Sequence, residues 1–161
     1  MNLITAPEPL SIQGKSVFLA GSIEQDRASQ WQNEIIKELK NINITILNPR
    51  RKKWNRAWKQ DINNPHFKEQ VEWELKGLEE ASCIVFYFDP KTKSPVTLLE
   101  LGLFAKSKKI IVCCPDGYWR KGNVDIVCQK YNIPTTKNIK HLIHYIKELN
   151  NPKGMTPSNP R

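Results

Sequence analysis

The sequence lacks any long apolar run, and this absence excludes a membrane-spanning helix of ordinary composition. None of its apolar stretches approaches the roughly 18–20 residues that a helix needs to cross a bilayer. Residues 1–15, MNLITAPEPLSIQGK, also lack the basic start and apolar core of a secretory signal. We therefore expect a cytoplasmic protein with no membrane partner.

Cysteine and histidine are both scarce, which argues against a metal site. The three histidines have no zinc-ligand spacing to the four cysteines, and no CxxC pair is present. We expect the thiols to be reduced and buried, and the residues imply no metal or redox cofactor. The cysteines are Cys83, Cys113, Cys114 and Cys128.

Acidic residues are also in deficit. The chain has 25 lysines and arginines against 16 aspartates and glutamates, a net charge of +9. This charge favours anionic partners such as nucleotides, nucleic acid or a membrane surface, without choosing among them. We expect much of it to be solvated lysine spread over helix surfaces.

What the sequence does contain is a regular alternation of strand-like and helix-like segments. Strands are expected at 16–23, 44–49, 83–89, 109–117 and 133–136, and helices at 29–41, 64–82, 94–108, 124–132 and 139–150. The alternation predicts an α/β fold, a flavodoxin-like three-layer sandwich whose five-stranded parallel sheet has the order 2-1-3-4-5. We expect an N-terminal extension over 1–14, one domain over 15–150, and a disordered tail over 151–161.

Ligands bind such sheets at the carboxyl ends of the strands, where the winding direction reverses. Here that point lies between the first and third strands. The turn after the first strand contains Gly21 and Ser22, and the third strand ends at Asp89. The next helix begins with Ser94 as its expected cap and carries Glu100 about two turns further on.

Two helices each place one carboxylate on a face that should be buried. Glu100 stands in VTLLELGLFA, apolar on nearly every side, which predicts a covered, central helix. Glu74 shares the face of an apolar stripe made of Phe67, Val71, Leu75 and Leu78. A buried carboxylate costs free energy unless it is hydrogen-bonded or faces a cavity.

Two such acids at one crevice are the minimum needed to cleave a glycosidic bond, although two unrelated structural carboxylates are the alternative. Asp89 is a third catalytic candidate, whose alternative role is that of a turn residue before Pro90.

Basic and aromatic residues alternate in NPRRKKWNRAWKQ, residues 48–60, after the second strand. In one interpretation Trp54 stacks on a nucleobase and Arg50 meets a phosphate or a carboxylate. The alternatives are binding of single-stranded nucleic acid, and a solvated loop whose tryptophans pack at a subunit contact. YWRKGNV, after the fourth strand, adds Trp119 and Asn123 at the same edge. Asn123 is a candidate for binding sugar or base, or else a turn residue.

Five segments together resemble the nucleoside 2-deoxyribosyltransferase-like family: VFLAGSI, NPRR, NPHFKEQVEWEL, SPVTLLELGLFA and WRKGNVDIV. The resemblance implies a flavodoxin-like fold and a nucleophile, Glu100, that forms a covalent deoxyribosyl intermediate before a second base takes the sugar. It matches Glu74 to an acid on the preceding helix, an Asp in better-known members, and Gly21 to the glycine of the first turn. The partners implied are nucleosides and free nucleobases.

One position departs from the better-known transferases. They carry an Asp six residues before the nucleophile, where it helps to hold the sugar, and this chain has Ser94. Related nucleoside 5′-monophosphate N-glycosidases have Ser there and use water as acceptor. The sequence thus favours a deoxyribosyltransferase and leaves open a monophosphate N-glycosidase, or a catalytically inactive nucleotide-binding module.

Similar enzymes are dimers or larger and share their sites across the contact, so the resemblance also implies a homo-oligomer. Trp119 or Asn123 is the residue that we expect a neighbouring subunit to supply. Nucleic acid is the less favoured partner.

Overall fold

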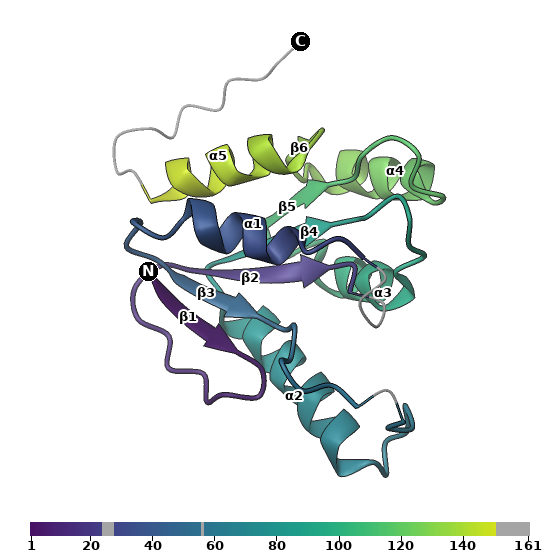
Figure 1. Ribbon diagram of the computed structural model, residues 1–161. Coiled ribbons are helices and arrows are strands. Elements are labelled where there is room, and N and C mark those ends of the chain that lie inside the picture. Colours follow the sequence, from purple (N-terminus) through teal and green to yellow (C-terminus); the bar gives the residue numbers. More distant parts are fainter. Residues whose placement is uncertain (24–27, 56, 151–161) are drawn as a thin grey trace.

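The computed structural model describes residues 1–23, 28–55 and 57–150, which form six parallel strands and five helices (Figure 1). The strands are β1 (Asn2–Thr5), β2 (Ser16–Gly21), β3 (Thr45–Asn48), β4 (Cys83–Tyr87), β5 (Ile110–Cys113) and β6 (Thr135–Thr136). The helices are α1 (Trp31–Glu38), α2 (Pro65–Glu80), α3 (Pro95–Phe104), α4 (Lys121–Tyr131) and α5 (Ile139–Leu149). The sheet order is β1-β3-β2-β4-β5-β6.

The expected α/β fold is confirmed, but the expected number of five strands is wrong. The five predicted strands do stand in the predicted relative order, and β1 adds a sixth beside β3, with Asn2 opposite Thr45. This strand lies in the segment that the sequence assigned to an extension. Four residues, of which only the last two are buried, carry too short an apolar pattern to identify an edge strand. The predicted tail, 151–161, lies outside the described residues.

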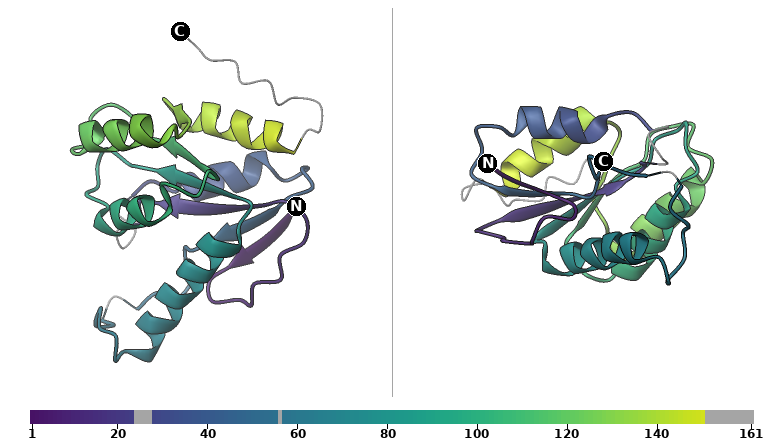
Figure 2. Two further views of the ribbon diagram at one scale, coloured as in Figure 1. Left: turned by 180° about the vertical axis from the view of Figure 1, so that it is seen from behind. Right: turned by 60° about the horizontal axis from the view of Figure 1, so that its bottom comes forward.

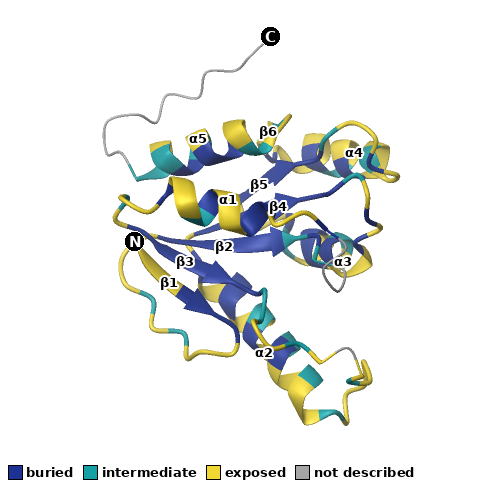
Figure 3. Ribbon diagram, viewed as in Figure 1, coloured by how far each residue is buried: buried dark blue, intermediate teal, exposed yellow. Residues whose placement is uncertain are grey.

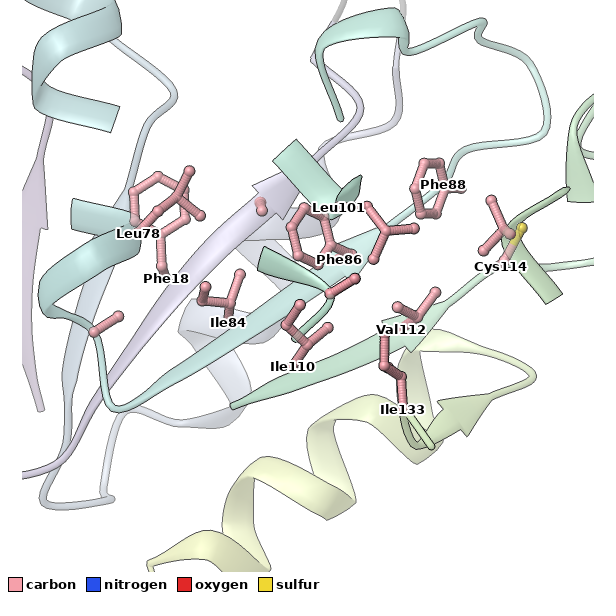
Figure 4. Close-up of a cluster of buried hydrophobic side chains, with 14 of the residues drawn as sticks. Phe18, Leu78, Ile84, Phe86, Phe88, Leu101, Ile110, Val112, Cys114 and Ile133 are labelled. Carbon is pink, nitrogen blue, oxygen red and sulfur yellow. The ribbon is translucent and has the colours of Figure 1, made fainter. Parts of the chain in front are cut away.

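The helices cover both faces of the sheet and make three layers, as Figure 2 shows from two sides. One face packs against α1 and α5, through clusters that include Leu19, Ile35 and Leu142. The other packs against α2, α3 and α4, and its cluster includes Phe18, Leu78 and Leu101 (Figure 4). Successive strand residues point to opposite faces, so β2, β3, β4 and β5 each contribute to both cores.

Helix α2 lies close to the sheet because of a glycine. A Cβ atom at Gly77 would lie 2.7 Å from the ring of Phe18, which β2 presents to this helix. The start of α2 is as predicted, since the side chain of Asn64 accepts hydrogen bonds from the amides of His66 and Phe67. Leu75, however, is exposed, and Trp73 is buried in its place.

Helix α3 differs from its predicted covered position. Its inner face is buried, but Val96, Leu99 and Leu103 are 58%, 63% and 60% exposed. These three side chains form an apolar outer face, and exposed residues are drawn in yellow along α3 in Figure 3. The prediction failed because the apolar character of a segment does not reveal how many of its sides have a neighbour in the fold.

The four cysteines are free and buried, as expected. Among the residues that the structure describes, no group of His, Cys, Asp and Glu has an arrangement that would hold a metal ion. No helix in this part of the chain is long and apolar enough to cross a membrane.

Candidate active site

A cavity of about 320 Å³ opens beside the carboxyl end of β2, between α2 and α3. A cavity of this size falls within the range that holds small ligands. Its walls come from β2, from the loop between β3 and α2, and from the inner faces of both helices. Six of the residues selected from the sequence line it: Gly21, Arg50, Trp54, Glu74, Ser94 and Glu100.

Gly21 ends β2 at a place where no side chain fits. Its φ of 154° is rare for other residues, and an added Cβ would collide with the carbonyl oxygen of Tyr87 and approach the ring of Trp31 to 2.8 Å. Glycine is therefore required here by the close approach of β4 and Trp31, and the residue also lines the cavity.

Glu100 projects from the inner face of α3 and is 8% exposed. Burial, and to a smaller extent the neighbouring charge of Glu74, raises its pKa from 4.5 to about 8. The side chain therefore does not reach the surface beside Val96 and Leu99, and it faces the cavity instead. This placement explains how one ionisable residue occupies an otherwise apolar helix.

Glu74 reaches the same cavity from α2 and accepts a 2.9 Å hydrogen bond from Nε2 of Gln70. Burial raises the pKa of Glu74 from 4.5 to about 7, and the bond from Gln70 opposes this rise. Because Glu74 and Glu100 interact, they titrate as a pair. Two carboxyl groups with raised, coupled pKa values can together supply a proton donor and a proton acceptor.

Behind the cavity lies a buried cluster of three hydroxyl groups, those of Ser22, Thr92 and Ser94. Oγ of Ser94 is hydrogen-bonded to Oγ of Ser22 and, at 2.7 Å, to Oγ1 of Thr92. Ser94 is the N-cap residue of α3, as predicted, but it has left-handed backbone angles and its side chain makes no capping hydrogen bond. Its hydroxyl is instead held against the ends of β2 and β4.

Asp89 does not line this cavity. Its carboxylate accepts hydrogen bonds of 2.9 Å from the amide and the hydroxyl of Ser29 and from the amide of Lys91. Burial alone would raise the pKa of Asp89, but these bonds outweigh it and leave the pKa lowered. The contacts attach the chain before α1 to the end of β4.

The loop after β3 covers the cavity with residues of the same chain. Trp54, at the cavity, contacts Trp58 edge to face, and Trp58 stacks on His66 with centroids 4.6 Å apart. The guanidinium of Arg51 lies over Trp58 and pairs with Glu69 at 2.9 Å. Arg50 donates to Oε1 of Gln32 at 3.0 Å.

Two selected residues lie away from the cavity within this chain. Trp119 is 51% exposed, and its Nε1 donates to the carbonyl of Lys93 at 3.0 Å. Asn123 is exposed on the first turn of α4. The sequence placed both at the correct edge of the sheet, but neither lines the pocket.

Sequence reasoning missed Gln60, Gln70 and Thr97 in the cavity wall, and Thr92 behind it. For Gln70 a signal exists, because a residue four positions before a buried carboxylate shares its helix face. For Thr92 there is none, since its loop position has no periodicity.

The chain matches the family described as "Nucleoside 2-deoxyribosyltransferase like" over residues 14–118, and it belongs to that family. The matched region contains both cavity carboxylates. A comparison with curated proteins found no match.

A solved structure supports the fold. The crystal structure titled "conserved protein from Enterococcus faecalis V583" superposes with a TM-score of 0.56 at 14% identity, covering 84% of this chain and 98% of that one. At this identity the likeness concerns the fold alone.

Proposed function

We propose that this protein is a nucleoside 2-deoxyribosyltransferase, which moves the sugar of a 2′-deoxynucleoside from one nucleobase to another. The observation that carries the proposal is the pair of carboxyl groups, buried Glu100 and half-buried Glu74, in one cavity of about 320 Å³. Because their pKa values are raised, these carboxyl groups gain and lose protons near neutral pH, where acid–base catalysis is most effective.

In the proposed reaction Glu100 attacks C1′ of the nucleoside as a carboxylate while Glu74 is protonated. Because the pKa of Glu100, about 8, exceeds that of Glu74, about 7, this is the less populated of the two forms that hold one proton. The bond between C1′ and the base nitrogen breaks, and the base leaves with the proton of Glu74, which becomes a carboxylate. A second base then attacks C1′, the ester bond to Glu100 breaks, and Glu74 recovers a proton from the incoming base. No net hydrolysis occurs, and every proton is returned.

The surroundings suit such a substrate. Trp54 offers a ring on which a nucleobase can stack, and Gly21 allows the sugar to approach the backbone. Phe18 and Val71 supply apolar walls, which keep water from the covalent intermediate.

A second candidate, hydrolysis of a nucleoside 5′-monophosphate at the same bond, is favoured by one specific feature. The cavity has an uncharged hydroxyl at Ser94 and two guanidinium groups, Arg50 and Arg51, in its walls. Such groups suit a phosphate, which prefers charge-assisted hydrogen bonds.

One assay separates the two enzymes. The protein is incubated with deoxyadenosine or deoxycytidine, or with the corresponding monophosphates, in the presence of free adenine or cytosine. We expect base exchange on the unphosphorylated compounds, seen by chromatography as a new nucleoside. Release of free base from monophosphates alone, with no exchange, would overturn the transferase in favour of the hydrolase.

We further propose that the protein forms a two-fold dimer through the outer face of α3. Val96, Leu99 and Leu103 are exposed there, and Val96 also lines the cavity, so a second copy on this face would lie at the mouth of the site. The only ionisable residue of α3 is the buried Glu100, so self-association through the outer face of this helix buries no charge. Trp119 or Asn123 would then reach a neighbouring site.

Sedimentation tests this dimer. We expect wild-type protein to sediment at twice the chain mass of 18.7 kDa, and Leu99→Lys to sediment as a monomer with reduced activity. Ile62→Lys, which changes another exposed apolar side chain, should leave the dimer intact. A fully active wild-type monomer would refute the shared site.

A further inference from the structure

The amide of Gln70 has a fixed orientation in a buried place. The side chain is 5% exposed, and its Nε2 donates to the carbonyl oxygen of Pro49 at 2.8 Å and to Oε1 of Glu74 at 2.9 Å. A backbone carbonyl can only accept, so Nε2 must face Pro49, and the amide cannot be reversed. Gln70 therefore links the end of β3 to the carboxylate of Glu74.

The same amide is poorly placed for stability. Its Oε1 is buried and has no hydrogen-bond partner among the described residues. An unpaired buried acceptor is destabilising, so a purely structural role would be served as well by an apolar side chain of similar shape. The two donated bonds are what distinguishes glutamine from methionine at this position.

We propose that Gln70 is a positioning residue of this site, whose amide holds the carboxylate of Glu74 against the end of β3 so that it faces the cavity shared with Glu100. The inference rests on the proposed function for its catalytic meaning. Its physical content, a hydrogen bond that sets the proton affinity of the pair, does not depend on any substrate.

The charged groups around Glu74 also influence its proton affinity. Glu100 faces it from α3, and Arg50 and Arg51 enter the same cavity from the loop after β3. Arg51 is paired with Glu69. Burial is the main influence that raises the pKa of Glu74, and the bond from Gln70 lowers it. Loss of this bond should therefore move the titration of the pair to higher pH.

The test compares Gln70→Met with wild-type protein and with Trp73→Phe. Methionine keeps the approximate size and removes both donated bonds. Trp73→Phe is the matched control, because it removes a buried bond from the same helix, Nε1 to the carbonyl of Glu8 at 2.7 Å, outside the cavity. Carboxyl carbons of glutamate are labelled and titrated by NMR without substrate, and Glu74→Gln and Glu100→Gln identify the two resonances.

We expect the midpoint of the Glu74 resonance to rise by about one pH unit in Gln70→Met, the equivalent of one hydrogen bond to a charged group, and to stay in place in Trp73→Phe. The alkaline limb of kcat/KM for base exchange should shift in the same direction. A Glu74 midpoint in Gln70→Met that lies within about 0.3 pH units of the wild-type value, roughly the precision of such titrations, overturns the inference. A shifted midpoint in a protein that acts on no nucleoside supports the role of Gln70 and refutes the proposed function instead.

Discussion

Replacement of Glu100 by glutamine will lower kcat/KM for base exchange by about 10⁴-fold or more, as is usual when a nucleophile is removed. The amide keeps the shape of the side chain, but it cannot form the covalent bond to C1′. Steady-state chromatographic assays with a deoxynucleoside and a free base measure the loss. Glu72→Gln is the control, since Glu72 lies on the exposed face of α2 and pairs only loosely with Lys68, at 3.6 Å.

The same variant should be more stable than the wild type, and the gain should grow with pH. The pKa of Glu100 is raised from 4.5 to about 8 in the folded protein. Its ionisation therefore opposes folding, with no penalty below about pH 4.5 and the full penalty above about pH 8. Glutamine has no such penalty, so its advantage appears across this interval and reaches on the order of 5 kcal/mol.

Denaturant unfolding at pH 5 and at pH 8.5 measures this difference. Glu72→Gln should change stability by less than about 0.5 kcal/mol at either pH. Full activity in a folded Glu100→Gln protein would contradict the catalytic assignment. A stability gain that does not depend on pH would contradict the buried, ionisable state of the carboxyl group.

Glu74→Gln will lower kcat/KM by about 10²–10⁴-fold, the usual effect of losing a general acid. Two changes in the pH profile of kcat/KM would identify Glu74 as the general acid. The alkaline limb should disappear, because no acid remains to lose its proton. The acidic limb should move to lower pH, because the charge of Glu74 no longer raises the pKa of Glu100.

A substrate that needs no acid tests the role of Glu74 directly. With 4-nitrophenyl 2-deoxyriboside, whose leaving group departs as a stable anion, Glu74→Gln should lose much less activity than it does with deoxyadenosine. Equal losses on both substrates would mean that Glu74 only positions Glu100. The exposed Glu72→Gln again serves as the control for a charge removed from the same helix.

Local patterns in the sequence were enough to predict most of the helices and strands of this protein. Alternating apolar segments indicated five strands and five helices, and Asn64 before Pro65 marked the start of α2, because these signals lie within a few neighbouring residues. Helical periodicity placed Glu74 on an inward face, and the apolar residues around Glu100 indicated that it is buried. Their common cavity followed from the topology, since adjacent parallel strands end at one edge of the sheet.

Patterns of this kind fail where a feature depends on a neighbour distant in the chain. The outer face of α3 is open because no element lies over Val96, Leu99 and Leu103, and the apolar letters of the segment are the same whether it is covered or not. The edge strand β1 forms because Asn2–Thr5 pairs in parallel with β3, about forty residues further along the chain. Its own four residues are too few to predict it.

The sequence by itself therefore determined the order of the elements and the presence of two inward carboxylates, because both are written in spacings of a few residues. Only the tertiary structure decided what those carboxylates contact. The hydroxyl of Ser94 is hydrogen-bonded to the hydroxyl of Ser22, 72 residues earlier in the chain. The amide of Gln70 donates to the carbonyl of Pro49, 21 residues earlier. Such bonds form only after packing has excluded water and brought distant donors and acceptors together, so no local pattern of side chains encodes them.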